Sequence, residues 1–102
     1  MRTLHAPRLD EYAAKHAGAA SALSAWLNVA RHAQWRNLME VRQTYAHADA
    51  VKLPSGRIVT VFNIKGNRYR LLTAIDYPMA VVNILGFLTH AEYAKEKWKE
   101  IR

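Results

Sequence analysis

Cysteine is absent from the 102 residues, which excludes disulfide bridges, thiolate metal sites and cysteine nucleophiles. Glycine and proline are scarce, with four and three residues, and the chain has no Gly/Ser-rich linker, internal repeat or low-complexity tract. No apolar run approaches the roughly 20 residues of a membrane span, and the opening segment, residues 1–7, does not have the pattern of a secretory signal. We therefore expect one domain, residues 1–102, in a reducing cytoplasm and away from membranes.

Acidic residues are also few, since eight Asp and Glu stand against fifteen Lys and Arg and give a net charge of +7. Hydrophobic residues make up 51% of the chain and charged residues 23%, so the composition is that of an ordinary globular protein. A positive field of this size attracts polyanions. We expect a partner such as nucleic acid, a ribosome or an acidic protein.

The first half of the chain carries helix signals. Pro7 suits the first turn of a helix and Gly18 suits its exit. A second helix is indicated by an apolar stripe at i, i+3, i+4 and i+7, formed by Leu23, Trp26, Leu27 and Ala30. A third, shorter helix is expected to open at Asn37, with Glu40 completing a capping box. Its buried side would consist of Leu38, Val41 and Tyr45.

After a turn signal at residues 53–56, the pattern changes from one typical of helices to one typical of strands. We expect an antiparallel meander of three strands, over Arg57 to Lys65, Arg68 to Tyr77 and Met79 to Leu88. A closing helix is expected from Thr89 to Ile101, with an apolar stripe formed by Ala91, Ala94, Trp98 and Ile101. Helices, then a meander, then a helix predict the α+β class with one sheet face covered.

The expected hairpin turn is Gly66-Asn67, and the strand register that it sets brings basic residues close together. Lys65 then lies opposite Arg68, and Asn63 lies opposite Arg70, with all four on one face near the turn. Three cations without a carboxylate repel one another, and an anion such as phosphate would relieve this repulsion. The alternative is a solvated hairpin tip whose charges provide solubility and edge protection.

The start of the closing helix contains residues that are candidates for acid–base catalysis. Thr89 and Glu92 form a second capping box, which puts His90 at the first helical position. The helix N-terminus favours a bound anion and disfavours an imidazolium, so a neutral His90 beside a phosphate could accept a proton. His90, Tyr93 and Lys97 share a stripe at helical spacing. The alternative is that His90 is a polar first-turn residue and Tyr93 a packing residue.

The sequence carries no strong signal for a metal site, a serine nucleophile or a phosphate-binding loop. The remaining histidines are dispersed without metal-ligand spacing, so we expect no metal and no cofactor. The serines lack a nucleophile elbow, and the chain has no GxxxxGK phosphate loop. The three tryptophans are expected in the core rather than as platforms for stacking bases: Trp26, Trp35 and Trp98.

Four segments between Trp35 and Trp98 carry a resemblance to a known family: residues 35–38, 42–45, 62–71 and 88–93. The two most specific are the hairpin F-N-I-K-G-N-R-Y-R-L and the helix start T-H-A-E-Y. They resemble the HigB family, toxins of bacterial toxin–antitoxin pairs that are related in fold to RelE. The resemblance implies N-terminal helices packed on a small antiparallel sheet, with a C-terminal helix.

The same resemblance implies an activity and a partner. The activity is ribosome-dependent, metal-independent cleavage of mRNA, in which a ribose 2′-OH attacks its own 3′ phosphate, and its result is inhibited translation. The partner is a helix-turn-helix antitoxin of the HigA kind, through which alone the toxin would meet operator DNA. Carried over to this sequence, the functional residues are Arg68, Arg70, His90 and Tyr93.

We therefore expect four catalytic residues. His90 would act as base on the 2′-OH or as acid toward the leaving 5′ oxygen, while Arg70 and Lys65 would hold the non-bridging phosphate oxygens. Tyr93 would donate to the leaving oxygen or stack on a base. The expected RNA-binding residues are Arg68, Asn63 and Lys97. Two other functions remain open: an RNA- or ribosome-binding module without catalysis, and an interaction domain for an acidic antitoxin.

Overall fold

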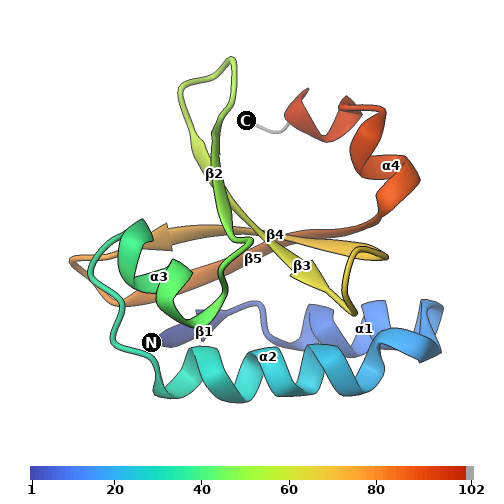
Figure 1. Cartoon of the computed structure of the whole chain (residues 1–102), viewed down its shortest axis with the longest axis horizontal. Helices are drawn as coiled ribbons and strands as arrows, with labels where there is room; N and C mark the ends of the chain where they lie inside the picture. The colour runs from blue at the N-terminus through green and yellow to red at the C-terminus, as the bar shows by residue number, and fades with distance from the viewer. Residues whose placement is uncertain (101–102) are drawn as a thin grey trace.

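A layer of helices packs on one face of a five-stranded sheet, and a short C-terminal helix lies over the other face (Figure 1). The computed structural model describes residues 1–100. The α+β class is confirmed, and none of the helices in these residues has the length and apolar character needed to cross a membrane. The elements are β1 (Arg2–Leu4), α1 (Pro7–Lys15), η1 (Ala17–Ala19), α2 (Ala20–His32), α3 (Leu38–Thr44), β2 (Asp49–Lys52), β3 (Ile58–Ile64), β4 (Tyr69–Asp76), β5 (Val81–Thr89), α4 (His90–Ala94) and η2 (Lys97–Glu100).

The strands lie in the order β1-β5-β4-β3-β2, with β2 to β5 antiparallel and β1 parallel to β5. The predicted register of the β3–β4 hairpin is confirmed, since Asn63 pairs with Arg70 and Ile64 with Tyr69. Directly opposed residues share a sheet face, so Asn63 and Arg70 project to the same side. The face that holds Ile64 and Tyr69 is covered by α1 and α2.

Two strands were not predicted, β1 and β2. They are three and four residues long, and they lie at the two edges of the sheet. Both are largely exposed, so neither has the alternation of apolar and polar residues that marks a half-buried strand. Each is defined by its pairing with a long strand, β5 or β3, and this pairing has no local signal in the sequence.

The three N-terminal helices are confirmed. α1 opens at Pro7, and α2 buries Leu23, Trp26 and Ala30. Asn37 caps α3, because its side-chain oxygen accepts the backbone N–H of Glu40 at 3.0 Å. The Glu40 carboxylate does not complete the predicted capping box. It accepts the backbone N–H of Arg36 at 2.8 Å and pairs with the guanidinium of that residue instead.

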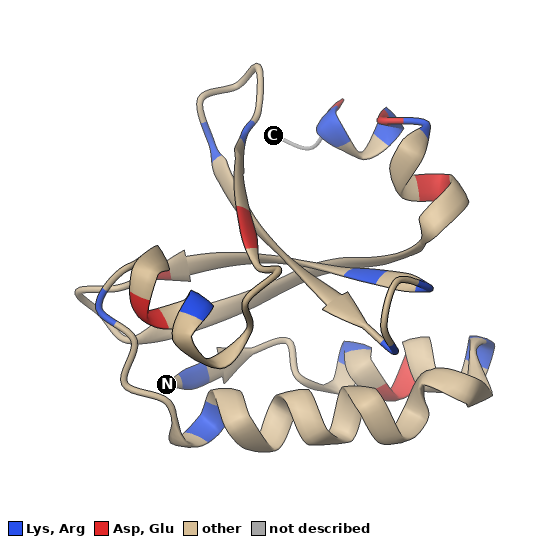
Figure 2. Ribbon diagram, viewed as in Figure 1, with Lys and Arg blue, Asp and Glu red and all other residues tan. Residues whose placement is uncertain are grey.

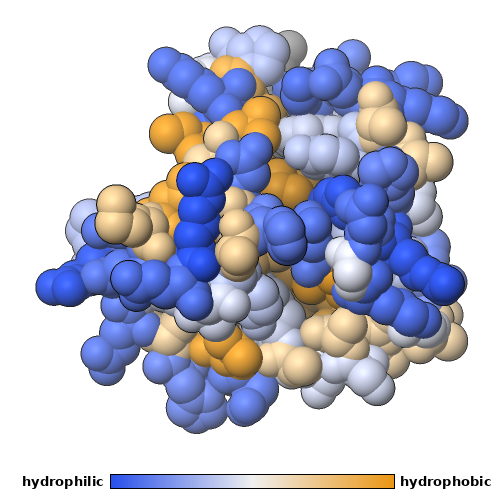
Figure 3. Space-filling view, in the orientation of Figure 1, coloured by the Kyte–Doolittle hydropathy of each residue, from blue (hydrophilic) through white to orange (hydrophobic). Residues whose placement is uncertain are grey.

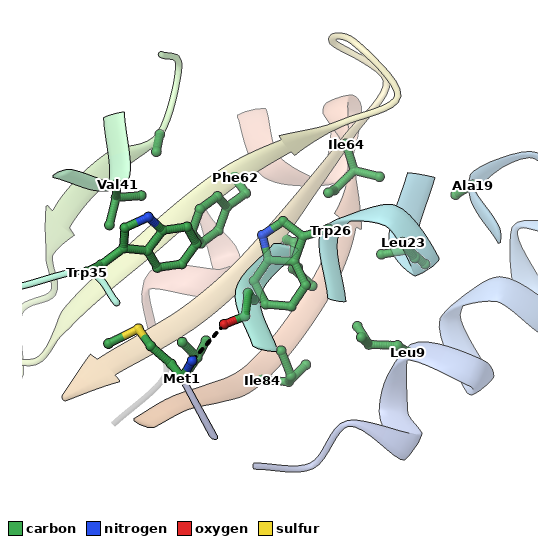
Figure 4. Close-up of a cluster of buried hydrophobic side chains, with 14 residues drawn as sticks. Met1, Leu9, Ala19, Leu23, Trp26, Trp35, Val41, Phe62, Ile64 and Ile84 are labelled. Carbon is green, nitrogen blue, oxygen red and sulfur yellow. Dashed lines mark hydrogen bonds between the residues drawn. The ribbon is translucent and has the colours of Figure 1, made fainter. Parts of the chain in front are cut away.

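The main core lies between α2, α3 and the sheet, and aromatic rings form its centre (Figure 4). Phe62 on β3 contacts the rings of Trp26, Trp35 and Tyr45, with centroid distances of 5.3, 6.1 and 5.4 Å. The three tryptophans are buried, as predicted. Phe62 is 0% exposed and therefore joins the helix layer to the sheet.

The closing helix is shorter than predicted. α4 ends at Ala94, and Glu96 adopts a φ of 61°, a left-handed conformation that interrupts the helix before η2. Trp98 then turns back onto the second sheet face, and its indole N–H donates to the carbonyl of Tyr93 at 3.0 Å. The expected apolar stripe is wrong for Ala91 and Ala94, which are exposed, and its last member, Ile101, lies outside the described residues.

Phe62→Ala removes the ring on which the core aromatic cluster is built. We expect the free energy of unfolding to fall by about 3–5 kcal/mol, because the cavity adds to the lost burial. Ile58→Ala on the same strand is the control, because Ile58 is 57% exposed and its truncation should change stability by no more than about 0.5 kcal/mol. Urea denaturation measures both, and similar losses for the two variants would contradict this description of the core.

Candidate active site

Arg70 is the only buried charged side chain among residues 1–100, with 8% of its surface exposed. The guanidinium folds back over the β3–β4 turn. Its Nη1 donates to the carbonyls of Asn67 at 3.1 Å and Tyr69 at 3.2 Å, and its Nη2 donates to the side-chain oxygen of Asn67. These contacts fix the guanidinium in place from one side.

No carboxylate of residues 1–100 neutralises this charge. The ion pairs of residues 1–100 are Arg36–Glu40, Arg42–Asp49 and Lys99–Glu96, and none involves Arg70. A guanidinium that is largely removed from water and held only by neutral acceptors retains its full positive charge. Its charge is therefore suited to attract an anion, and a phosphate would replace one of the neutral acceptors that now hold the Nη groups.

His90 stands next to this guanidinium. The β4–β5 ladder ends at the pair Tyr69–Thr89, so α4 begins beside the start of β4. The backbone N–H of His90 donates to the carbonyl of Arg68 at 2.9 Å, which ties α4 to the hairpin turn. The imidazole Nδ1 lies 3.4 Å from Nη2 of Arg70. Because a guanidinium only donates, Nδ1 carries the lone pair and Nε2 the proton of the neutral ring.

The capping box predicted for α4 is confirmed and fixes the position of His90. Thr89 Oγ1 accepts the backbone N–H of Glu92 at 3.2 Å, and the Glu92 carboxylate accepts the N–H of Thr89 at 2.9 Å. That backbone N–H is the main reason why the pKa of Glu92 is lowered, with the Thr89 hydroxyl, His16 and Lys95 adding to the shift. A lowered pKa in the folded chain means that the carboxylate stabilises the fold above its unfolded pKa, and that this stabilisation is lost as the pH falls through the folded value.

Tyr93 forms the third side of the site. Its ring lies 5.4 Å from the Arg70 guanidinium carbon and stacks on Trp98, with centroids 5.0 Å apart and planes inclined by 12°. Trp98 thus holds Tyr93 against the arginine, and the cation lies over an aromatic face. Three of the predicted catalytic residues, His90, Arg70 and Tyr93, therefore converge.

Lys65 does not join them, and the expectation that it shares a face with Arg70 is wrong. β3 ends at Ile64, and Lys65 takes a left-handed φ of 54° within the turn, so strand alternation no longer sets its direction. A Cβ built on Gly18 would lie 2.9 Å from the Lys65 amine, which places that amine beside η1 in the helix layer. Arg70 is on the opposite face, with Tyr93.

The three predicted RNA-binding residues lie in different surroundings. Arg68 is exposed on the β3–β4 turn, and Asn63 is half-buried opposite Arg70. Lys97 lies in η2 and lines a hollow with Glu92, Lys95, Leu88 and Trp98. The expectation that Lys97 continues the stripe of His90 and Tyr93 is wrong, because the helix ends before it.

Asn67 was missed by the sequence analysis, which treated it only as a turn residue. Its backbone and side-chain oxygens accept hydrogen bonds from Arg70, so it orients the central cation of the site. Its place in a turn three residues before an arginine was the only signal. Sequence could not show that the guanidinium folds back onto the turn.

The surroundings of the site are basic and hydrophilic. Lysines and arginines lie on the β3–β4 turn, at the start of β4 and along the C-terminal segment (Figure 2). Hydrophilic side chains cover the side of the molecule where this turn and α4 lie (Figure 3). Residues 1–100 contain no group of three or more histidine, aspartate or glutamate side chains that could hold a metal ion.

A family model, described as HigB_toxin, the RelE-like toxic component of a toxin–antitoxin system, matches residues 19–96. The chain belongs to the HigB toxin family. The match runs from α2 to α4 and therefore includes Arg70, His90 and Tyr93. As the toxic component of such a system, this HigB-family protein has an antitoxin as its partner. No curated protein matches the chain.

Thr89→Ala removes the side chain that caps α4. We expect a loss of about 1 kcal/mol in the free energy of unfolding, because the N–H of Glu92 then lacks its acceptor. Thr89→Ser keeps a hydroxyl at the cap and should restore most of this loss. Urea denaturation of both variants measures the effect, and equal stability of the alanine variant and the parent would show that the cap contributes nothing.

Proposed function

We propose that this HigB-family toxin is an endoribonuclease that cuts mRNA on the ribosome by attack of a ribose 2′-OH on its own 3′ phosphate. The observation that carries the proposal is the contact of a buried guanidinium, which has no carboxylate partner among residues 1–100, with an imidazole and a phenol. Arg70, His90 and Tyr93 supply a phosphate-binding cation, a proton acceptor and a hydroxyl donor within one small region.

Arg70 binds the scissile phosphate in this mechanism. Negative charge builds on the non-bridging oxygens as the 2′ oxygen attacks, and a cation that is already fixed stabilises this charge without reorganising. The bonds from Nη1 and Nη2 to Asn67 and the bond from Nη1 to Tyr69 hold the guanidinium before substrate arrives. Its partial burial strengthens the interaction, because less water screens the charges.

His90 and Tyr93 handle the protons. The lone pair of neutral His90 is on Nδ1, where it accepts from Nη2 of Arg70. A phosphate that takes over this Nη2 donor frees Nδ1, which then accepts the 2′-OH proton. The leaving 5′ oxygen is displaced on the opposite side of the phosphorus, and the Tyr93 hydroxyl donates to it. The products are a 2′,3′-cyclic phosphate and a 5′-hydroxyl. Water returns the proton from His90 to Tyr93 and restores both residues.

The remaining predicted residues serve binding in this proposal. Arg68 is exposed on the turn beside the site and contacts the RNA backbone, and Lys97 adds to the positive field of the C-terminal segment. Lys65, whose amine lies beside Gly18, contributes only to this general field. We further propose that the antitoxin is a helix-turn-helix protein of the HigA kind, that the toxin meets operator DNA only through it, and that the pair acts in the cytoplasm.

His90→Ala tests the nuclease directly, because His90 is exposed and its removal should leave the fold intact. We expect cleavage of ribosome-bound mRNA to fall by about 10²–10⁴-fold, the usual contribution of one positioned acid or base. His32→Ala, an exposed histidine on α2, is the matched control and should cleave like the parent. Sequencing of the RNA ends measures the rate and detects the cyclic phosphate.

Two results would contradict the proposal. Full cleavage by His90→Ala would remove His90 from the mechanism. Ribosomes that bind the parent chain while their mRNA stays intact would favour the rival function, an RNA- or ribosome-binding module without catalysis. Binding of that kind should weaken steeply with salt, because each neutralised phosphate releases counterions.

A further inference from the structure

A second small hollow, of about 230 Å³, lies one strand away from Arg70. It forms where α3 ends and the chain turns into β2, against the last part of β3. The residues that line it are Thr44, Tyr45, Ala46, His47, Ala48 and Asn63. None of the six carries a carboxylate, an ammonium or a guanidinium, although the chain as a whole has a net charge of +7. An uncharged ligand therefore suits this hollow better than a phosphate.

Asn63 connects the hollow to the candidate active site. On one side it pairs with Arg70 across the β3–β4 ladder. On the other side, the β2–β3 ladder begins only at Asp49, opposite Val61, so no strand lies beside Asn63 there. Continuing this register would put His47 opposite Asn63, and the turn that contains His47 occupies the space. Neighbouring strands are about 5 Å apart, so the hollow opens within one nucleotide's reach of a phosphate on Arg70.

The polar side chains of the hollow lack hydrogen-bond partners among residues 1–100. These side chains are the hydroxyls of Thr44 and Tyr45, the His47 imidazole and the Asn63 amide, whereas the Ala48 carbonyl accepts from Arg42 at 2.8 Å. Asn63 and Tyr45 are half-buried, and their polar side-chain atoms are not among the buried, unpartnered atoms of residues 1–100, so a ligand in the hollow can reach them. Packing of its ring against Phe62 and Trp35 fixes Tyr45, and burial raises the pKa of its hydroxyl, which keeps it a neutral donor.

We propose that this hollow binds the base of the nucleotide whose phosphate is held by Arg70, and that it thereby sets the base preference of cleavage. A nucleobase is flat and uncharged, and its edge presents both donors and acceptors. The Asn63 amide has the complementary pair of groups, and an imidazole such as that of His47 stacks on bases or bonds to their edges. The inference rests on the proposed ribonuclease function, because the base is located by the phosphate at Arg70.

A binding experiment tests the inference without requiring cleavage. The backbone amides of the isotope-labelled parent chain are followed by NMR while inorganic phosphate, or one of the four nucleoside 3′-monophosphates, is added. We expect phosphate to shift the signals of Arg70 and His90 alone. The nucleotides should also shift those of residues 44–48 and Asn63, by amounts that differ between the bases. If the nucleotides shift only the signals that phosphate shifts, the inference is overturned and the phosphate site stands.

Variants extend the test to activity. His47→Ala and Asn63→Ala should flatten the distribution of bases at the cleaved positions, with about a tenfold loss at the preferred base, since one good base contact gives discrimination of that order. Asn28→Ala, the same change at an exposed position on α2, is the control for Asn63 and should keep the parent distribution. An unchanged distribution in both pocket variants would overturn the inference. In His90→Ala, slowed cleavage with the signals of residues 44–48 still shifting on nucleotide binding would support the inference independently of the chemical step.

Discussion

The site depends on a positive charge that the fold buries without an acidic partner among residues 1–100. Burying an ion costs free energy, and the carbonyls and the side-chain amide of the β3–β4 turn offset this cost for Arg70 only in part. The same tight turn that lets β3 and β4 pair therefore also holds a cation that an anion would neutralise, and the aromatic ring of Tyr93 lies over this cation.

Three local devices bring His90 to this charge. The β4–β5 ladder runs until Tyr69 meets Thr89, the capping box starts α4 at the next residue, and the N–H of His90 bonds to the hairpin turn. The left-handed residue Glu96 ends the helix and lets the chain fold back. Trp98 then stacks on Tyr93 and holds it beside Arg70. The capping box is local to the start of α4, whereas the ladder and the His90 N–H bond join that start to β4 and its turn.

Short-range signals explain what the sequence could predict. The hairpin register and the Thr89 cap follow from residues a few positions apart, and the predicted meander then brings the end of β5 and the start of α4 beside Arg70. The left-handed turn residue Lys65 and the helix break before Lys97 were unpredictable, because non-glycine residues take such conformations only where the surrounding structure compensates. The edge strands β1 and β2 were missed for a related reason, since their pairing partners lie far away in the chain. The hollow beside Asn63 forms where the chain turns into β2, so it could not be predicted without that strand.

The contact between Arg70 and His90 can be measured most directly through the imidazole itself. Long-range ¹H–¹⁵N NMR of the His90 ring at pH 8, where an ordinary imidazole is neutral, reports which nitrogen carries the proton. The contact with Arg70 predicts the Nε2–H form, with an Nδ1 signal that moves when a 2′-deoxy dinucleotide is added. A ring protonated on Nδ1, and unaffected by the dinucleotide, would contradict it, because that nitrogen could then neither face the guanidinium nor take a proton from the ribose.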